Sequence, residues 1–318
     1  MRVRLFYHDR CFDGACSAAL FAEFFRRRFD PGADFILTGL FHRADQLFDE
    51  ELFDGDENVI VDFKYSPSAK LTWWFDHHQS AFLSPEDGEH FERDTSGKKF
   101  YDPSFKSCTR FIATIGQQKF SFDPTGLEEL IRWADVIDGA QYRDAREAVE
   151  MEAAAMKLTL VLEAAKENRS KQIIPLLTER SLDEIVALPW VSECFEALFQ
   201  RHMESIELIR ARGKRSGNTV FFDLSDTDHG GYNKFIPYYL FPESVYTVAV
   251  SDAGFRTKVS VGSNPWAPME PRHNLATICE SYGGGGHSRV GAISYGPQEL
   301  NRARRTAREI VDKLSATG

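Results

Sequence analysis

The sequence predicts an α/β protein with two domains. A mainly parallel sheet flanked by helices should form the N-terminal domain, and a helical linker should lead to a smaller α/β domain. Three observations predict this: short apolar segments alternate with helical ones in the first half, long helical stretches occupy the middle, and a hairpin pattern follows near the C-terminus. A chain of 318 residues is long enough for two hydrophobic cores.

The N-terminal half should contain four main strands. They are expected at residues 3–8, 34–41, 58–63 and 71–76, with a helix that has an apolar face at 14–29. Residues 79–125 are polar and rich in turn residues, so we expect an excursion there with one helix near 105–117. Apolar residues spaced by three and four predict a further helix at 126–138.

Two long helices are expected in the middle of the chain, at about 144–168 and 181–213. Ser181 and Glu184 have the spacing of a capping box at the start of the second helix. Pro189 should interrupt that helix after one or two turns, because proline lacks the backbone N–H that a helix interior uses.

The C-terminal part should be a separate domain. A connecting helix at 202–214 leads to a hairpin at 245–251 and 255–261, a glycine-rich turn at 283–292 and a basic helix at 298–315. We therefore expect a first domain at 1–195, a linker helix at 196–214 and a second domain at 215–318.

The net charge of −10 is unevenly distributed. Residues 1–200 hold 23 Lys and Arg against 36 Asp and Glu, whereas residues 201–318 hold 15 against 12. This balance excludes a broad basic surface for long duplex nucleic acid. An acidic first part suits metal binding and a mildly basic second part suits phosphate contacts, although a solvated acidic surface would carry the same charge.

Cysteine usage and hydropathy favour a cytoplasmic protein without a membrane partner. The five cysteines lie far apart and form no CxxC pair, which argues against a disulfide framework or a zinc ribbon. No apolar run approaches the roughly 18 residues that span a bilayer, and the N-terminus has no signal-peptide pattern.

Polar residues follow three of the predicted strands. His8, Asp9 and Asp13 come at the end of the first, Asp62 ends the third, and the string Asp76-His77-His78 ends the fourth. The carboxyl ends of parallel strands line the ligand crevice of an open α/β sheet, so these side chains should converge. Carboxylates and imidazoles without thiolates suit Mn²⁺, Mg²⁺, Fe or Zn²⁺. A cluster of this size can hold two ions about 3.5–4 Å apart, an arrangement used for phosphate ester hydrolysis.

The sequence resembles the DHH phosphoesterase superfamily, in particular its RecJ- and NrnA-type members with a C-terminal GGGH domain. Five motifs occur in the expected order over nearly the whole chain: YHDRCFDGACSAAL (7–20), VIVDF (59–63), DHHQS (76–80), WADVIDGA (133–140) and GGGGHSRVGA (283–292). The resemblance implies a two-domain enzyme with its active site in the cleft between the domains.

The resemblance also implies roles for individual residues. The implied metal ligands are His8, Asp13, Asp62, His77 and Asp135, with Asp62 as the bridge between two ions. Asp76 would orient the imidazole of His77, and His78 would face the substrate. Asp138 is the rival of Asp135, because both lie on one helical face.

The first motif departs from the family pattern. The family usually has two aspartates in a D-x-D arrangement there, and Ala15 takes the second place in this chain. One site then loses a ligand, and either Asp9 or water would replace it.

The C-terminal glycine run predicts a substrate contact. Successive glycines let backbone N–H groups approach a phosphate, at Gly284, Gly285 and Gly286. His287 and Arg289 would add a donor and a cation, and Arg256 lies on a strand face of the same domain. A flexible loop is the alternative reading of four glycines.

The function expected from these features is hydrolysis of small nucleotide phosphoesters by a metal-activated water. Short oligonucleotides, 3′-phosphoadenosine 5′-phosphate and cyclic dinucleotides are the expected substrates, and an oligomer is compatible with the sequence. Mn²⁺ is the expected ion, with Mg²⁺, Co²⁺ or Fe²⁺ as alternatives. A RecJ-like single-strand exonuclease and a catalytically silent nucleotide-binding protein are the alternative functions.

Overall fold

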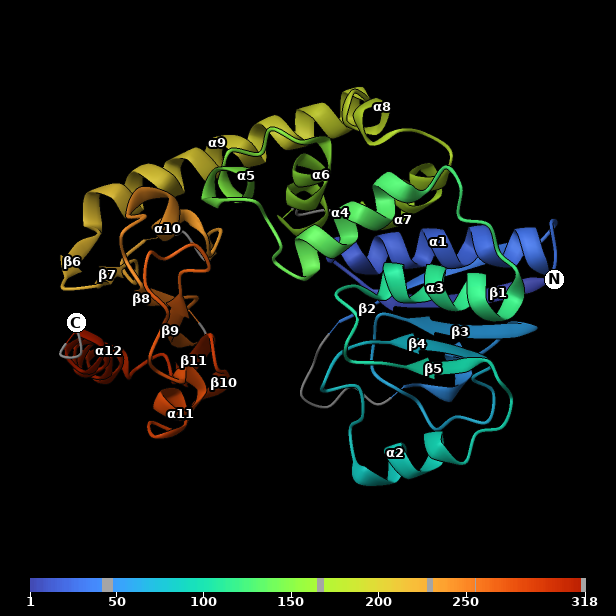
Figure 1. Ribbon diagram of the computed structural model, residues 1–318, viewed down its shortest axis with the longest axis horizontal. Coiled ribbons are helices and arrows are strands. Elements are labelled where there is room, and N and C mark those ends of the chain that lie inside the picture. The colour runs from blue at the N-terminus through green and yellow to red at the C-terminus, as the bar shows by residue number, and fades with distance from the viewer. Residues whose placement is uncertain (42–47, 165–168, 228–230, 255, 316–318) are drawn as a thin grey trace. The chain divides into compact units, whose positions relative to one another are not determined.

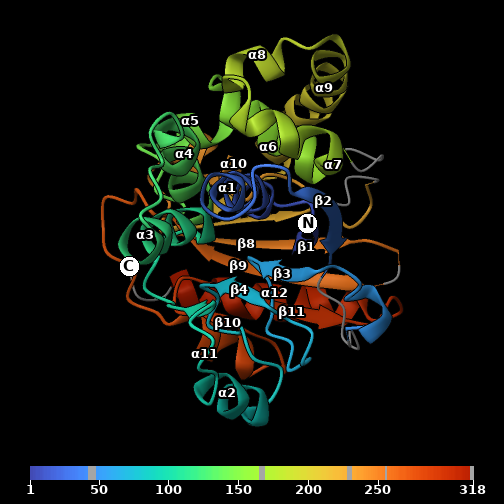
Figure 2. The same cartoon turned by 90° about the vertical axis from the view of Figure 1, so that its right-hand side faces the viewer.

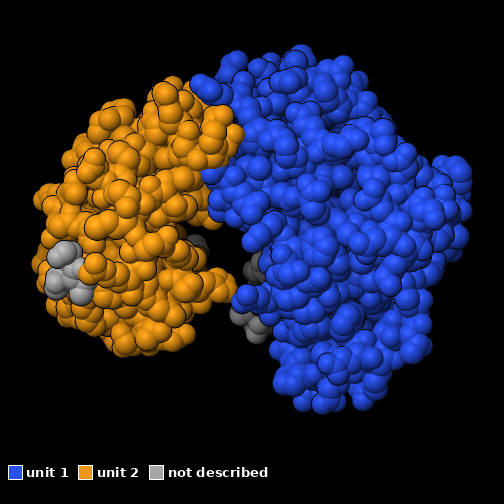
Figure 3. Space-filling model, in the orientation of Figure 1, with its two compact units in different colours: residues 1–142, 152–198 blue, residues 143–151, 199–318 orange. Residues whose placement is uncertain are grey.

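The structure is a computed structural model that describes residues 1–41, 48–164, 169–227, 231–254 and 256–315 (Figure 1). The chain forms two compact units, coloured separately in Figure 3. The first comprises Met1–Tyr142 and Glu152–Leu198, and the second comprises Arg143–Met151 and Phe199–Gly318. The boundaries 1–195, 196–214 and 215–318 inferred from the sequence stay a prediction about independent domains.

The sequence predicted a mainly parallel sheet, and the sheet of the first unit is entirely parallel. Its strand order is β2-β1-β3-β4-β5, with bounds β1 Arg2–His8, β2 Asp34–Leu40, β3 Glu57–Val61, β4 Trp73–Asp76 and β5 Lys99–Tyr101. The sequence did not reveal β5, because only three residues of a polar region form it. Strands β1, β3 and β4 are neighbours in this order, so the three predicted polar strand ends share one edge of the sheet.

Helices cover both faces of this sheet (Figures 1 and 2). Helices α1 (Phe12–Arg28) and α3 (Cys108–Phe120) pack on one face, where the ring of Phe21 in α1 lies 5.8 Å from that of Trp73. Helix α2 (Pro85–Glu92) lies on the other face, where Phe91 contacts Trp74 at 5.2 Å. The two adjacent tryptophans of β4 therefore fill opposite cores, as the alternation of a strand requires.

The middle of the chain differs in part from the expected helices. The stretch 144–168 forms two helices, α5 (Ala145–Val149) and α6 (Ala154–Ala164), and its last four residues lie outside the described part. The expectation of one helix was wrong, because the chain turns between them at Met151, which has a positive φ of 55°.

The capping box and the interruption at Pro189 are confirmed. Ser181 and Glu184 cap α8 (Leu182–Val186) reciprocally, and α9 (Pro189–Arg212) begins at the proline. The remaining elements of the first unit are α4 (Glu128–Asp138), α7 (Ser170–Ile173) and the short 3₁₀ helices η1 (Glu50–Leu52) and η2 (Ile174–Thr178). Within the described ranges, no helix is both long and apolar enough to cross a membrane.

The second unit contains a mixed sheet of six strands in the order β10-β11-β9-β8-β7-β6. The bounds are β6 Lys214–Ser216, β7 Thr219–Asp223, β8 Tyr246–Asp252, β9 Thr257–Ser263, β10 Gly285–His287 and β11 Val290–Tyr295. The predicted hairpin is confirmed as the antiparallel pair β8 and β9. Besides α5 and the C-terminal part of α9, this unit contains α10 (Ile236–Leu240), α11 (Leu275–Glu280) and α12 (Leu300–Ser315). Helix α12 buries one apolar face in the core.

Candidate metal centre

Three neighbouring strands deliver polar side chains to one edge of the first sheet. His8 is the last residue of β1, Asp62 follows β3 directly, and Asp76 ends β4 with His77 and His78 after it. Helix α1 starts close above this edge, because a Cβ at Gly14 would lie only 2.0 Å from the carbonyl oxygen of His8. The convergence expected from the sequence therefore occurs.

Asp62 lies at the centre of the cluster. Its side chain is fully buried, and its backbone has a left-handed conformation with φ of 56°. Oδ2 lies 3.4 Å from Nδ1 of His8, and Oδ1 lies 3.4 Å from Nε2 of His77. Neither oxygen accepts a hydrogen bond from any described residue. A buried carboxylate without hydrogen bonds is costly unless a cation balances it, so these atoms fit a metal site.

His77 presents one ring nitrogen to three carboxylates. Its Nδ1 lies 3.1 Å from the carbonyl oxygen of Phe105, which can only accept, so Nδ1 carries a proton. Its Nε2 lies 3.4 Å from Oδ1 of Asp62, 3.6 Å from Oδ2 of Asp13 and 3.4 Å from Oδ2 of Asp138. A carbonyl that fixes one nitrogen and turns the other to acidic groups is the usual arrangement of a metal-binding histidine.

Asp13 is held by the start of α3. Its Oδ2 accepts a hydrogen bond from the N–H of Cys108 at 2.7 Å. Its Oδ1 accepts from the N–H and the hydroxyl of Thr109 at 3.0 and 2.6 Å. The backbone N–H groups at a helix N-terminus stabilise negative charge, and they fix this carboxylate in front of His77.

Asp76 contacts a different histidine from the one expected. Its Oδ1 accepts hydrogen bonds from the backbone N–H groups of His77 and His78, at 2.8 and 3.2 Å, and lies 2.7 Å from Nδ1 of His78. The sequence led us to expect that Asp76 orients His77. Side chains two residues apart on an extended chain point the same way, so Asp76 reaches His78 instead.

Asp138, and not Asp135, lies beside His77. Asp135 accepts a hydrogen bond from the hydroxyl of Ser107 at 2.6 Å and pairs with the guanidinium of Arg110. These contacts turn its carboxylate away from the cluster, although it lies only three residues before Asp138 on α4. The metal-ligand role expected for Asp135 therefore does not fit the structure, whereas the alternate Asp138 occupies the required position.

The cluster shifts the pKa values of its members strongly. Burial alone would lower the pKa of His77, but its contact with Asp62 and the charges of Asp13 and Asp138 raise it to about 10. For His78, burial is outweighed by Asp76 and then Asp62, and the pKa rises to about 9. Burial and the nearby Asp62 raise the pKa of Asp138 to about 6. The carboxylates thus draw protons onto both imidazoles, and a divalent cation would balance the same charges.

The ligand atoms form three groups, each within 4.8 Å. They are Asp62 with His77 and His78, Asp13 with His77 and Asp138, and His8 with Cys11 and Asp62. Asp62 belongs to two of them and faces His8 with one oxygen and His77 with the other. The donor set is mainly oxygen and nitrogen, so the residues present fit a divalent cation of the Mn²⁺ or Mg²⁺ kind.

Comparison with known proteins decides the fold. No protein-family model matches the sequence, and a search of curated proteins finds no match. A solved structure of a pGpG-specific phosphodiesterase, PggH from Vibrio cholerae, aligns over 100% of both chains with 21% identity and a TM-score of 0.70. The DHH domain of a member of the s1p family of ribosomal proteins aligns over 98% of this chain and 87% of its own, at 13% identity and a TM-score of 0.60. The chain has the fold of the DHH superfamily.

A third DHH-fold structure, RecJ from Thermus thermophilus in complex with Mn²⁺, is similar at 14% identity with a TM-score of 0.57. The alignment covers 98% of this chain but only 52% of RecJ, so this chain spans about half of that protein. RecJ from the same organism was also crystallised with Mg²⁺, and that structure has a TM-score of 0.55.

One side chain of the candidate metal centre of this DHH-fold chain was not predicted from the sequence. Cys11 lies close to His8 and Asp62, but only carboxylates and imidazoles were expected as ligands, so its thiol was not included. The signal was its place in the first motif, three residues after His8 and two before Asp13. The alternate Asp9 is turned elsewhere, since its Oδ1 accepts hydrogen bonds from the N–H of Arg10 and the hydroxyl of Ser170, both at 2.8 Å.

The glycine-rich stretch, which was predicted as a turn, forms a β-hairpin in the second unit. Strands β10 and β11 pair with Gly286 opposite Gly291. A Cβ at Gly284 would lie 2.3 Å from the carbonyl oxygen of Ala292, and one at Gly286 would lie 2.2 Å from that of Val290. Packing therefore demands these two glycines. A Cβ at Gly285 would meet no described atom within 4 Å, so its side-chain face is open.

The basic residues expected at the substrate are exposed. His287 and Arg289 lie at the hairpin tip, and Arg289 pairs with Glu270 at 3.2 Å. Arg256 is exposed just before β9. A role in substrate binding stays a prediction for these residues and for Gly284, Gly285 and Gly286.

A cavity of about 540 Å³ also opens in the second unit. It lies among α5, α9 and α10, and its lining includes Arg146, Arg210, Tyr239 and Trp266. None of its lining residues belongs to the candidate metal centre or to the glycine hairpin.

Proposed function

We propose that this protein is a metal-dependent phosphoesterase that hydrolyses small nucleotide phosphodiesters, with a linear dinucleotide as the preferred substrate. The observation that carries the proposal is the buried carboxylate of Asp62, which faces His8 and His77 and accepts no hydrogen bond from the described chain. The alignment with a pGpG-specific phosphodiesterase, which covers 100% of each chain, supports the choice of a dinucleotide.

We assign the ligands to two positions that share Asp62. His8 and Asp62 would hold one ion, while Asp13, His77 and Asp138 would hold the second together with the other oxygen of Asp62. The mainly oxygen and nitrogen donors favour Mn²⁺, with Mg²⁺, Co²⁺ and Fe²⁺ as alternatives.

The remaining residues have roles that follow from their contacts. When bound, the ions would lower the pKa of a water and polarise the phosphate. Asp76 holds Nδ1 of His78, so His78 would act through Nε2, donating a hydrogen bond or a proton to an oxygen of the phosphate. The carbonyl of Phe105 keeps His77 in one ring orientation, and the start of α3 keeps Asp13 in place.

The negative charge of the chain favours a small substrate over a long nucleic acid. The chain carries a net charge of −10, and its first 200 residues are the more acidic part. A long nucleic acid binds mainly through phosphate contacts with basic residues, which an acidic surface does not supply. A dinucleotide needs only local contacts, to the ions and to a few donors such as those of the glycine hairpin.

The test compares substrates under defined metals. Protein freed of metal by a chelator would receive Mn²⁺, Mg²⁺, Co²⁺ or Fe²⁺, and would be assayed on pGpG, 3′-phosphoadenosine 5′-phosphate, cyclic di-GMP and a 5′-labelled single strand of about 30 nucleotides. We expect Mn²⁺-dependent turnover with the highest kcat/KM for pGpG. Preference for the long strand would favour the RecJ-like exonuclease instead. Nucleotide binding without turnover under every ion would favour the silent binding protein.

A further inference from the structure

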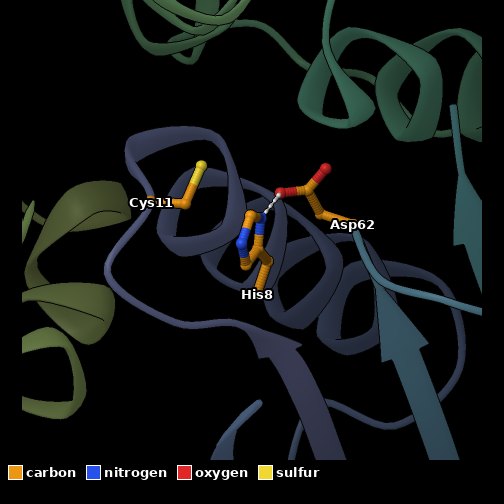
Figure 4. A group of neighbouring side chains, drawn as sticks. All are labelled: His8, Cys11 and Asp62. Atoms are coloured by element: carbon orange, nitrogen blue, oxygen red, sulfur yellow. Dashed lines mark ion pairs between the residues drawn. The ribbon is translucent and has the colours of Figure 1, made fainter. Parts of the chain in front are cut away.

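The thiol of Cys11 belongs to the cluster at the strand ends. Its sulfur, a ring nitrogen of His8 and an oxygen of Asp62 all lie within 4.8 Å of one another (Figure 4). Figure 4 also shows the ion pair that joins the imidazole of His8 to the carboxylate of Asp62. Cys11 is a free cysteine at the N-cap of α1, and its side chain makes no capping hydrogen bond.

A second observation points to a cation at this place. Asp62 is fully buried, and both of its carboxylate oxygens lack a hydrogen bond within the described part of the protein. Oδ2 of Asp62 faces His8 at 3.4 Å, on the side where Cys11 lies. A buried anion that faces a nitrogen and a sulfur donor fits a metal ion better than it fits any neutral contact.

Cys11 can supply the donor atom that the first motif lacks because Ala15 takes the place of its second aspartate. Ala15 is fully buried within α1 and offers no donor atom. Asp9 does not replace it, since its carboxylate accepts hydrogen bonds from Ser170 and from the N–H of Arg10. A Cβ at Gly39 would lie 2.1 Å from Oδ2 of Asp9, so the second oxygen is packed against β2. Among the described residues, Cys11 is the side chain whose donor atom lies within 4.8 Å of donor atoms of both His8 and Asp62.

We propose that the Cys11 thiolate is the third protein ligand of the ion held by His8 and Asp62, which gives this position a softer donor set than the one at His77. The thiol would lose its proton to solvent when the ion binds. A site with one sulfur, one nitrogen and one oxygen donor favours Zn²⁺, Co²⁺ or Fe²⁺ over Mg²⁺. The inference rests on the proposed metal-dependent function, but it concerns one ligand of one ion.

The test is optical and needs no turnover. Metal-free wild type, Cys11→Ser and the control Cys194→Ser would be titrated with Co²⁺, while absorption is recorded from the near-ultraviolet to the visible. A thiolate bound to Co²⁺ gives a charge-transfer band in the near-ultraviolet, whereas oxygen and nitrogen ligands give only the weaker visible bands. We expect the near-ultraviolet band in wild type and in Cys194→Ser, and its loss in Cys11→Ser.

Affinity gives an independent readout. In Cys11→Ser, the affinity of one site for Co²⁺ should fall by at least about 10- to 100-fold. Loss of a residue that only supports a metal ligand already costs about this much. Cys11→Asp should keep two sites and shift the preference of one from Co²⁺ and Zn²⁺ toward Mn²⁺ and Mg²⁺. Circular dichroism of each metal-free variant would confirm that the fold is intact.

The Co²⁺ titration distinguishes failure of the Cys11 ligand role from failure of the proposed metal-dependent function. Visible Co²⁺ bands in wild type without a near-ultraviolet band, or an equal band in Cys11→Ser, would overturn the role of Cys11 and leave metal-dependent hydrolysis standing. No uptake of Co²⁺ or Mn²⁺ by wild type would overturn the proposed function and the role of Cys11 together.

Discussion

Oδ1 of Asp62 lies 3.4 Å from Nε2 of His77, and neither atom makes a hydrogen bond with the described part of the chain. Two buried polar atoms that face each other without a hydrogen bond are rare in folded proteins. Both residues directly follow neighbouring strands of one parallel sheet, so the backbone holds the pair in place. The pair therefore lies at the centre of the site at which we propose that a cation binds.

Replacing Asp62 with asparagine should abolish hydrolysis. Asn tolerates the left-handed backbone of this position and keeps the shape of the side chain, but it removes the shared negative charge. We expect kcat to fall by about 1,000-fold or more, which corresponds to roughly 4 kcal/mol of barrier. Steady-state kinetics with Mn²⁺ checks this, and a thermal melt of the metal-free variant serves as the control for folding. Turnover within tenfold of wild type would remove Asp62 from the site.

Replacing each of the two aspartates of α4 should have very different effects on Mn²⁺ binding. Asp138→Asn should weaken binding of one Mn²⁺ and lower kcat, because Asp138 lies 3.4 Å from His77. Asp135→Asn should leave metal binding unchanged and cost about 1 kcal/mol or less of stability, since its pairing with Arg110 is partly exposed. Isothermal titration with Mn²⁺ compares the two variants. The reverse result would restore Asp135 as the ligand.

Asp76→Asn should act through His78. The amide cannot hold the Nδ1–H of His78 as the carboxylate does, so we expect kcat to fall about 10- to 100-fold with little change in Mn²⁺ affinity. Adding His78→Gln should cause little further loss, because residues that act as one unit are not additive. Fully additive losses in the double variant would show that Asp76 works independently of His78.

The glycine hairpin offers a matched pair of variants. Gly285→Ala places a methyl group where no described atom lies within 4 Å, so the fold should be unaffected. If the backbone of this strand contacts a substrate phosphate, the methyl group should raise KM with little effect on kcat or melting temperature. Gly286→Ala should instead lower the melting temperature, because its Cβ would lie 2.2 Å from a carbonyl oxygen. An unchanged KM in Gly285→Ala would argue against the hairpin as a substrate contact.

Metal removal should destabilise the first unit. Mn²⁺ at about 100 times its dissociation constant adds about 2.7 kcal/mol to the free energy of unfolding, which corresponds to a rise of about 5–10 °C in melting temperature. Differential scanning calorimetry with Mn²⁺ and with a chelator measures the difference. Asp62→Asn should show little of this rise, and an equal rise in that variant would mean that the ion binds elsewhere.

The sequence predicted the parallel sheet and most of the cluster because both depend on local patterns. Apolar runs that end in Asp or His identify strands and their ligand-bearing ends, so His8, Asp62, His77 and their neighbours could be found without coordinates. Strand β5 was not predictable, since a three-residue strand has no periodicity of its own. The break at Met151 was missed for a similar reason, as no Gly or Pro marks it.

The choice among neighbouring residues could not be made from the sequence. Asp135 and Asp138 lie on one side of α4, and the positions of Ser107 and Arg110 decide which carboxylate is drawn away. The partner of Asp76 depends on the direction in which the chain leaves β4. Cys11 was not predicted because its possible role as a ligand depends on its closeness to Asp62, which lies 51 positions later in the chain.

The hydrogen bonds from the start of α3 to Asp13 offer a way to detect metal binding at the site. The oxygen that accepts the amide proton of Cys108 at 2.7 Å is the same Oδ2 that lies 3.6 Å from His77. An ion that draws electron density from this oxygen would weaken that hydrogen bond, and it would do so at a buried amide on the first turn of α3. Hydrogen exchange and the chemical shift of the Cys108 amide would therefore report occupancy directly, in a sample that contains neither substrate nor an optical label.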